Sequence, residues 1–577
     1  MLYRSTRGHS SGLSFEDAVF AGLAPDGGLY VPHDIPTVTP DQLAAWKDLS
    51  FPDLATSIFR LFIAQDEIPD ADLADIVRRS FATFSSPDVT PLAKLPNVDA
   101  PPPPPPSSSS TATTASNNSD LANLYVLELF HGPTFAFKDV ALQVLGNFFE
   151  YFLERKNRAA AADKNNNYGI TVLGATSGDT GGAAIYGLRG KNNVDVFILH
   201  PKGRISDVQR QQMTSVLDPN VHNIAVEGTF DDCQDIVKAA FSDQPFRTRF
   251  HLAAVNSINW ARILAQTSYY FHSYFALVRR IGDDETARVQ YCVPTGNFGD
   301  VLAGYYAVRM GLPIARLIVA TNENDILHRF FQTGTYEKKR TSSGEEKVKA
   351  TLSPAMDILV SSNFERLLWY LARGDGRSAA AGKKTSAEEE DSAAQNASKY
   401  IVEWMNALKT TGGFTVPADL HTRARELFDS FCTSDAMTTD AIRRYYHHRY
   451  TPGATAHYVL DPHTAVGVVA AEQIVTTTTT ASISTTTTTT YTVCLSTASP
   501  GKFPDAVLEA INDAKTNKPQ GFKPIAYADF APPQLVALKG LPTRCVDVTN
   551  DGGDAGIALE KVRAVLEGVV GAKFPKQ

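Results

Sequence analysis

The chain has 577 residues, 43% of them hydrophobic and 20% charged, and a formal net charge of −8 at pH 7. This composition is typical of a soluble globular protein of two or three domains, and the acidic balance argues against a nucleic-acid-binding protein. No apolar run reaches the ~20 residues of a membrane-spanning helix, and no signal-peptide core opens the chain. The five cysteines are scattered, so we expect no structural zinc or disulfide framework and a cytoplasmic protein.

Residues 1–95 are predicted to form a mostly helical N-terminal domain. Helical patterns occur at residues 13–20, 40–47, 53–64 and 70–84. Ser14 is the expected N-cap of the first of these helices. Residues 96–120 contain six consecutive prolines and a Ser/Thr/Asn tract, which cannot bury a core. We interpret residues 96–120 as a linker or insertion.

Residues 121–577 are interpreted as a single region built from alternating strands and helices. Strands are predicted at 124–129, 168–173, 194–199, 221–226, 289–293 and 314–320. This alternation predicts an α/β fold with a parallel sheet covered by helices on both faces, and a site at the carboxyl ends of the strands. Two further low-complexity segments, near 371–397 and 476–490, are interpreted as insertions, the second as a threonine-rich extended loop.

A lysine follows the first predicted strand of this region. The strand at 124–129 is broken by a turn, and a helix then runs toward Phe152. Lys138 is expected in the first turn of that helix, where the helix dipole and burial by Phe135 and Phe137 would lower its pKa. A sheltered neutral amine is what Schiff-base chemistry needs. The alternative is a surface lysine on an amphipathic helix.

Two glycine-rich loops join predicted strands to helices. Residues 174–182 read Gly-Ala-Thr-Ser-Gly-Asp-Thr-Gly-Gly, and residues 294–300 read Pro-Thr-Gly-Asn-Phe-Gly-Asp. Such loops let backbone N–H groups converge on a phosphate or carboxylate. Neither loop has the Walker A or the GxGxxG pattern. A basic turn after the strand at 194–199 offers a second phosphate site, with a solvated loop as an equal alternative; its candidate residues are Lys202, Arg204, Ser206 and Gln209.

Together, these motifs resemble those of threonine synthase, in a fungal-like form with low-complexity insertions. The three core motifs are residues 131–139, 175–183 and 294–300, and further matching segments lie between residues 3 and 36 and at 256–263, 461–467 and 495–503. The resemblance therefore spans most of the chain. It implies a tryptophan synthase β-like fold (fold type II), with two open parallel or mixed-sheet α/β subdomains in residues 121–577 and the mostly helical N-terminal domain.

The resemblance also implies the cofactor and the residues of the site. Pyridoxal 5'-phosphate would be held by Lys138, the catalytic residue. Further cofactor-binding residues would be Gly296, Asn297, Phe298, Asp300 and Thr497, the last through its hydroxyl at the pyridine nitrogen. The amino-acid substrate would be held by Thr176, Ser177, Gly178, Asp179 and Thr180, with Arg204 and Ser206 as candidates for its phosphate. No metal is expected.

The implied reaction converts O-phospho-L-homoserine and water into L-threonine and phosphate by γ-elimination and β-hydration, the last step of threonine biosynthesis. The implied protein is a monomer or homodimer that binds neither nucleic acid nor membrane. Two alternatives remain at this point. One is another type II pyridoxal-phosphate enzyme, such as a serine/threonine dehydratase. The other is an inactive relative that binds a phosphate-bearing ligand.

Overall fold

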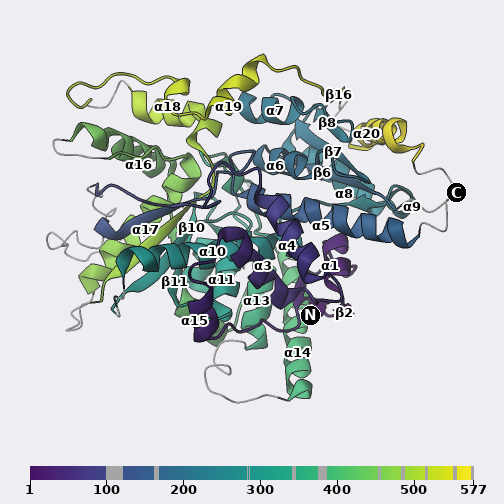
Figure 1. Cartoon of the computed structure of the whole chain (residues 1–577), viewed down its shortest axis with the longest axis horizontal. Helices are drawn as coiled ribbons and strands as arrows, with labels where there is room; N and C mark the ends of the chain where they lie inside the picture. The colour runs from purple at the N-terminus through teal and green to yellow at the C-terminus, as the bar shows by residue number, and fades with distance from the viewer. Residues whose placement is uncertain are drawn as a thin grey trace.

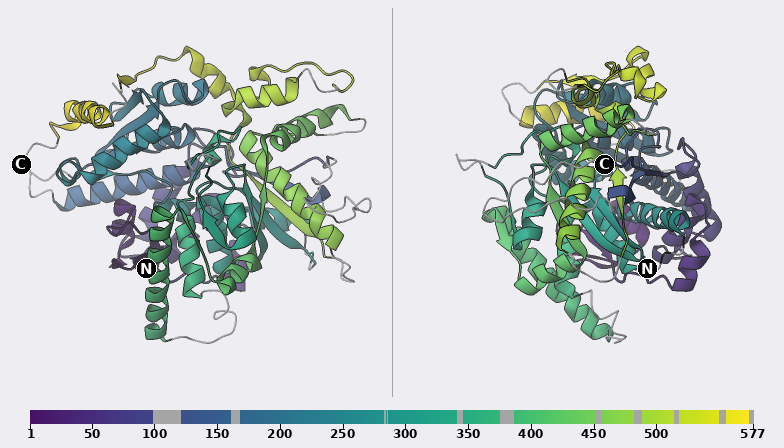
Figure 2. Two further views of the ribbon diagram at one scale, coloured as in Figure 1. Left: turned by 180° about the vertical axis from the view of Figure 1, so that it is seen from behind. Right: turned by 90° about the vertical axis from the view of Figure 1, so that its left-hand side faces the viewer.

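Two sheets in different halves of the molecule form the framework of the computed structural model (Figure 1, Figure 2). The structure describes residues 1–98, 121–160, 168–282, 284, 286–340, 346–374, 386–451, 456–481, 488–513, 518–549 and 555–573. Most of the predicted linker at 96–120 therefore lies outside the described residues. Among the helices of these ranges, none is long and apolar enough to cross a membrane.

The first 95 residues form a mostly helical layer. Its elements are β1 (Tyr3–Ser5), β2 (Ser11–Leu13), β3 (Tyr30–Pro32), α1 (Phe15–Ala21), α2 (Pro40–Trp46), α3 (Phe51–Phe62) and α4 (Asp70–Phe81). The Ser14 side chain accepts a hydrogen bond from the N–H of Asp17, which confirms it as the N-cap of α1. The ring of Tyr3 lies 5.7 Å from that of Trp260, so this layer shares a core with the rest of the chain.

The first α/β sheet is five-stranded and parallel, in the order β16-β8-β7-β6-β9. Its strands are β6 (Ile170–Ala175), β7 (Val194–Pro201), β8 (Val221–Val226), β9 (Leu252–Ala253) and β16 (Val546–Val548), and its helices are α6 (Asp179–Leu188), α7 (Asp207–Thr214), α8 (Phe230–Ser242), α9 (Gln244–Arg249) and α20 (Ala555–Val570). Alternate residues of β7 enter different cores: Ile198 faces one and Phe197 the other. Both faces of this sheet are thus covered, as the apolar runs predict.

The second sheet is six-stranded and mixed, in the order β14-β11-β10-β15-β5-β4. Its strands are β4 (Leu92–Lys94), β5 (Leu124–Glu128), β10 (Arg288–Pro294), β11 (Ile314–Thr321), β14 (Phe428–Cys432) and β15 (Thr490–Ser496). All neighbours are parallel except β4, which runs antiparallel to β5 at the edge. Two open parallel or mixed sheets plus a helical N-terminal region confirm the predicted fold class.

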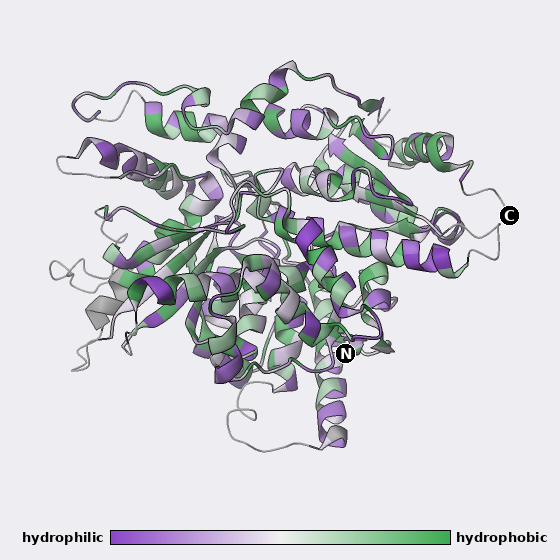
Figure 3. Ribbon diagram, in the orientation of Figure 1, coloured by the Kyte–Doolittle hydropathy of each residue, from purple (hydrophilic) through white to green (hydrophobic). Residues whose placement is uncertain are grey.

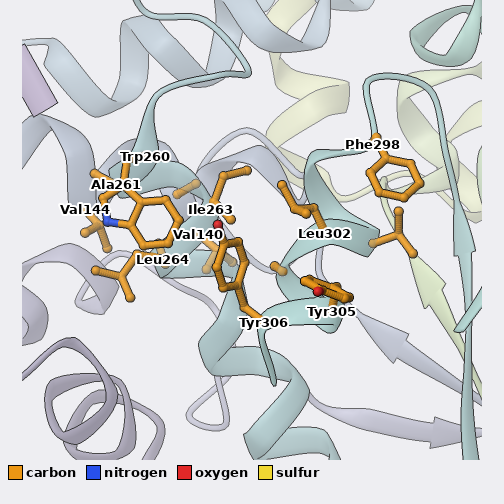
Figure 4. Packing of buried hydrophobic residues seen from close by; sticks show 14 of the residues in the cluster. Val140, Val144, Trp260, Ala261, Ile263, Leu264, Phe298, Leu302, Tyr305 and Tyr306 are labelled. Carbon is orange, nitrogen blue, oxygen red and sulfur yellow. The ribbon is translucent and has the colours of Figure 1, made fainter. Parts of the chain in front are cut away.

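Three helices pack together beneath the site. They are α5 (Lys138–Ala159), α10 (Trp260–Ile281) and α11 (Gly299–Arg309). Figure 4 shows Trp260 against Tyr306, with ring centroids 5.0 Å apart, and Val144 beside them. Helix α5 begins at Lys138, and α11 begins within the glycine-rich loop at 294–300. The core that these helices share therefore fixes the position of Lys138 relative to that loop.

The segment 371–397, predicted to be an insertion, is helical in its second part. Helix α13 (Phe364–Arg373) ends there, but α14 (Ala387–Thr410) begins with a capping box between Ser386 and Glu389. The acidic run is the first turn of α14, where carboxylates stabilise a helix, and Asp391 pairs with Arg4 at 3.2 Å. Helix α14 projects from the body with a largely hydrophilic free end (Figure 1, Figure 3).

The start of the predicted extended loop at 476–490 is also helical, and residues 482–487 lie outside the described residues. Helix α17 (Pro462–Ala481) continues into the threonine tract, and β15 already begins at Thr490. The remaining elements are α12 (Ile326–Thr333), β12 (Thr335–Glu337), β13 (Gly413–Thr415), α15 (Ala418–Leu427), α16 (Asp435–His447), α18 (Pro504–Asn512) and α19 (Pro533–Val536). Helix α17 packs against β10 and β15.

Candidate active site

A cleft of about 1460 Å³ contains the loops that follow the strands of both sheets. The cleft is lined by Lys138 at the start of α5 after β5, by residues 174–177, 179 and 180 after β6, by residues 294–300 after β10 and by Thr497 after β15. Gly178 is not one of the described residues that line it. These strands end at this side of their sheets, which is where ligand sites of open α/β sheets lie. The lysine and the two glycine-rich loops therefore meet in one place.

Lys138 is the first residue of α5, with 9% of its surface exposed. Its Nζ lies 4.6 Å from the ring centroid of Phe137 and 3.9 Å from Oδ2 of Asp179. Burial lowers the pKa of the Lys138 amine to about 8; the charges of Lys502 and Arg262 also lower this pKa, while Asp179 opposes them. Near neutral pH the amine is thus more often neutral than that of an ordinary lysine, as attack on a carbonyl requires.

The loop before α5 is paired with the segment after β15. The N–H of Phe137 donates to the carbonyl oxygen of Thr497 at 2.8 Å, and the N–H of Ser499 donates to that of Phe135 at 3.0 Å. Phe135 has a φ of 58°, a left-handed conformation that bulky residues rarely adopt. These contacts hold Thr497 against the residue that precedes Lys138.

The loop after β10 has the features of a phosphate cradle. Its carbonyl groups face a neighbouring segment: the oxygen of Asn297 accepts from the N–H of Asn363 at 3.1 Å and from its side-chain amide at 2.9 Å. Within the described part of the chain, the N–H groups of Gly296, Asn297 and Phe298 donate to no group. A Cβ on Gly296 would lie 3.1 Å from the carbonyl oxygen of Ala355, so a larger residue would crowd this neighbouring backbone. The phosphate of pyridoxal phosphate fits these free donors and the helix N-terminus that follows.

Asp300, in the first turn of α11, is buried against two tyrosines. Its Oδ1 accepts hydrogen bonds from the hydroxyls of Tyr269 and Tyr270, the latter at 3.0 Å. Its Oδ2 has no hydrogen-bond partner among the described residues. Burial raises the pKa of the Asp300 carboxyl to about 7, although both hydroxyls lower it.

The loop after β6 is shaped from inside by Thr176. Its hydroxyl accepts hydrogen bonds from the N–H groups of Gly178 at 3.0 Å and Gly181 at 2.8 Å. Ser177 and Thr180 line the cleft, and Ser177 is exposed to it. Of the hydroxyls in this loop, those of Ser177 and Thr180 are thus the ones available to a ligand.

Asp179 is a buried counter-ion. Its Oδ1 lies 2.8 Å from Nζ of Lys502 and accepts a hydrogen bond from Gln209 at 2.9 Å, while Oδ2 faces Lys138. Burial alone would raise the pKa of the Asp179 carboxyl, but Lys502 and Lys138 outweigh it and hold that pKa below its ordinary value. The ionised side chain would repel a substrate carboxylate, so it contributes to the site through the two lysines.

The basic turn after β7 reaches the cleft only through Arg204. Arg204 is exposed and lines the cleft. The hydroxyl of Ser206 caps α7 by accepting from the N–H of Gln209 at 3.2 Å, and Ser206 is not one of the described residues that line the cleft. Lys202 pairs with Asp547 at 2.7 Å.

Two cations of the site were not predicted. Arg262, in the first turn of α10, is 3% exposed and lines the cleft, and its Nε and Nη1 have no hydrogen-bond partner in the described part of the chain. Burial lowers its pKa to about 10, so it stays charged at neutral pH. Lys502 is fully buried in the turn after β15. Both lie in the family-like segments 256–263 and 495–503, but no spacing marks them as functional.

Comparison with protein families agrees with this geometry. A family model described as pyridoxal-phosphate dependent enzyme matches residues 110–398. Models described as threonine synthase N terminus and threonine synthase, C-terminal, match residues 2–81 and 464–557. The two sheets, the buried lysine and the phosphate cradle define a pyridoxal-phosphate-dependent enzyme of fold type II.

Comparison with individual proteins over most of the chain identifies the family within this class of enzymes. The chain is 50% identical to the threonine synthase of Saccharomyces cerevisiae over 543 residues, 94% of this chain and 93% of that protein. The chain therefore belongs to the threonine synthase family. A crystal structure of threonine synthase from yeast has 45% identity and a TM-score of 0.81, covering 98% of this chain and 99% of that one. A pyridoxal-phosphate-bound threonine synthase from Brucella melitensis has 38% identity and a TM-score of 0.75, with the same coverage of both chains.

These relatives confirm the predicted enzyme class, cofactor and threonine synthase activity. The family models match the N-terminal, central and C-terminal residues that line the cleft, except His463, which lies just before the C-terminal match. The dehydratase and the inactive binding protein are not favoured.

Proposed function

We propose that the substrate is O-phospho-L-homoserine, which is converted with water into L-threonine and phosphate in the last step of threonine biosynthesis. The observation that carries this proposal is the buried guanidinium of Arg262, whose Nε and Nη1 have no partner among the described residues. Loop 296–298 already offers free donors for the cofactor's phosphate. A second anion site in the same cleft suits a substrate with a phosphate of its own.

In this proposal Lys138 and the loop after β10 would hold the cofactor. The N–H groups of Gly296, Asn297 and Phe298 would hold its phosphate, and the Thr497 hydroxyl would hold its pyridine nitrogen. Asp300 supports the cradle from below through Tyr269 and Tyr270. When bound, the cofactor supplies an electron sink for charge that develops beside the amino group of the substrate.

The substrate is proposed to lie across the cleft from the cofactor phosphate. The hydroxyls of Ser177 and Thr180, with the N–H groups at the start of α6, grip its carboxylate. Arg262 holds its phosphate, and the exposed Arg204 reaches the same anion from the other sheet. The hydroxyl of Ser206 is already engaged in capping α7, so its contribution is limited to holding this turn.

Lys138 is proposed to move the protons of the reaction. Its amine would take protons from the α and β carbons of the substrate and return protons to the γ carbon, once the phosphate has left, and finally to the α carbon. The low pKa of this amine, about 8, makes the neutral base available near neutral pH. Arg262 neutralises the phosphate as it leaves the γ carbon, and water adds at the β carbon.

The decisive experiment measures phosphate release and threonine formation from O-phospho-L-homoserine by the purified protein. L-serine and L-threonine serve as the dehydratase arm, read as ammonia release. Arg262→Met should raise KM for O-phosphohomoserine about tenfold to a hundredfold, the loss expected for a charge-assisted contact, while the cofactor stays bound. Arg204→Ala should show a smaller increase. Unchanged kinetics in Arg262→Met would remove the substrate-phosphate site from this proposal.

Two properties of the whole protein are also proposed: a cytoplasmic location and a monomeric or homodimeric state. The cysteines among the described residues, such as the exposed Cys545, are free thiols, as expected in a reducing compartment. Cell fractionation and light scattering of the purified protein test the two properties separately.

A further inference from the structure

Lys502 is a second lysine beside the site, and the proposed function gives it no role. It lies in the turn η4 (Pro500–Lys502) directly after β15, with none of its surface exposed. Its Nζ lies 2.8 Å from Oδ1 of Asp179 and donates to the carbonyl oxygen of Thr134 at 2.9 Å. A buried charge is costly even when paired, and an apolar side chain could fill the same volume. The charge itself therefore needs an explanation.

The amine of Lys502 joins three segments of the site. Thr134 precedes α5, and its N–H and hydroxyl donate to Asp139 at 2.8 and 2.6 Å. Asp179 opens α6 at the substrate loop, and Lys502 itself follows β15. One ammonium group thus links the segments that carry the cofactor lysine, the substrate loop and the residue at the cofactor ring.

The carboxylate of Asp179 is shared unequally between two lysines. Oδ1 contacts Lys502 at 2.8 Å and accepts from Gln209 at 2.9 Å. Oδ2 lies 3.9 Å from Nζ of Lys138, which is beyond hydrogen-bond distance. The close ion pair is therefore made with Lys502, and Lys138 interacts only with the remaining charge.

We propose that Lys502 is a positioning residue that binds the Asp179 carboxylate and thereby keeps the Lys138 amine free to take the cofactor and to move protons. Lys502 touches neither cofactor nor substrate in this scheme; it acts through Asp179. The inference rests on the role of Lys138 under the proposed function, and its test is separable from that role.

The electrostatics around Lys138 define the expected effect. Burial has the largest influence on the pKa of Lys138 and lowers it. The nearby carboxyl groups of Asp179, Asp139 and Asp300 favour the charged amine, whereas Lys502 and Arg262 disfavour it. Loss of Lys502 removes a positive charge and leaves Asp179 free to pair with Lys138. Both changes raise the pKa of Lys138 from about 8 toward its ordinary value.

The test uses Lys502→Met and follows attachment of pyridoxal phosphate to the apoenzyme. The rate of covalent attachment, read from visible absorbance, is measured from neutral to alkaline pH. The midpoint should rise by about one pH unit or more in Lys502→Met, so attachment at neutral pH slows about tenfold. Lys191→Met is the matched control, because Lys191 pairs with Glu150 at 3.0 Å but does not line the cleft. A folded Lys502→Met protein with the wild-type midpoint would overturn the proposal.

A second variant shows whether Lys502 acts through Asp179 and covers a single variant that fails to fold. Lys502→Met/Asp179→Asn removes both charges of the ion pair, so neither partner is left as an unpaired buried charge. Its midpoint should lie below that of Lys502→Met or, where that variant does not fold, at or below that of the wild type. If the double variant has the same midpoint as Lys502→Met, the result counts against the proposal. Where Lys502→Met does not fold, a double-variant midpoint above that of the wild type counts against it. Borohydride reduction and peptide mapping of the wild type test Lys138 independently of Lys502.

Discussion

At the scale of single residues, the site depends on one amine that loses its proton more easily than an ordinary lysine. Lys138 lies at the start of a helix, in a buried position, with two further cations nearby. Each of these features disfavours the ammonium form. Among the neighbouring charges, Asp179 opposes them most strongly, and its close ion pair is made with Lys502.

Lys138→Ala should fold but form essentially no threonine. Alanine is a good helix former, so α5 can still begin at this position. Loss of proton transfer alone costs ~10²–10⁴-fold in rate, and covalent attachment of the cofactor is lost as well. Threonine formation is measured by an activity assay, and attachment of the cofactor to Lys138 by mass spectrometry after borohydride reduction. A pyridoxyl adduct on another lysine of the unmutated protein would contradict the assignment.

Asp300 should make the stability of the apoprotein depend on pH. Burial raises its pKa to about 7 in the folded protein, whereas the unfolded chain ionises near the ordinary 3.8. Between these values the folded state binds more protons, so Asp300 lowers the free energy of unfolding as pH rises toward 7. A pKa difference of one between the folded and unfolded states corresponds to about 1.4 kcal/mol.

Asp300→Asn cannot ionise and should remove this dependence. Its stability relative to the wild type should therefore increase between pH 5 and pH 8, as measured by urea unfolding of the apoproteins. The same difference at both pH values would mean that Asp300 does not titrate in this window.

The sequence predicts some of these residues and not others, for a physical reason. Lys138 can be placed because a strand, a turn and a helix follow one another locally. Arg262 and Lys502 become special only through burial and through the partners that they have or lack, and Lys502 meets Asp179 from a distant part of the chain. Neither burial nor contact with a distant residue can be seen in a local sequence pattern.

At the scale of elements, the loop between β6 and α6 depends on Gly178. Its φ is 143°, and a Cβ there would lie 2.4 Å from the side-chain amide of Gln209. Gly178→Ala should push Gln209 away from Asp179 and destabilise the protein by roughly 1–3 kcal/mol through strain and the lost contact. Gly203→Ala is the matched control, since Gly203 also has a positive φ but nothing within 4 Å of its Cβ position. Equal unfolding midpoints for the two variants in urea would contradict this prediction.

Strands were predicted more reliably than the elements in biased sequence. The apolar run at 194–199 can only be buried, and β7 is buried along its whole length. The acidic and alanine-rich residues near 388 have the composition of a solvated tract. They are helical because Ser386 caps α14 and because Ile401 and Trp404, further along, anchor its other end in the core. Composition correctly indicates that the start of α14 is solvated, but packing of its later residues makes the segment helical.

At the scale of the whole molecule, the segment around 101–118 should be dispensable. Lys94 of β4 is paired with Tyr125 of β5, so the ends of the connection are held close together by the sheet. Replacement of residues 101–118 by a short Gly/Ser loop should leave kcat unchanged, because halving a loop changes its closure cost by only ~0.6 kcal/mol. Thermal unfolding and steady-state kinetics measure the outcome. A deletion that also removes β4 is the contrasting variant, since it would uncover the edge of β5.

The position of β15 has a consequence for the order in which the chain is made. This strand is sixth in its sheet by sequence, yet it lies between β10 and β5 and pairs with both. Until residues 490–496 leave the ribosome, no strand joins β5, which leads to Lys138, to β10, which leads to the phosphate cradle. The five-stranded sheet likewise waits for β16 at its edge. A nascent chain therefore carries exposed strand edges through most of its synthesis, and the cofactor site comes into being only when translation is nearly complete.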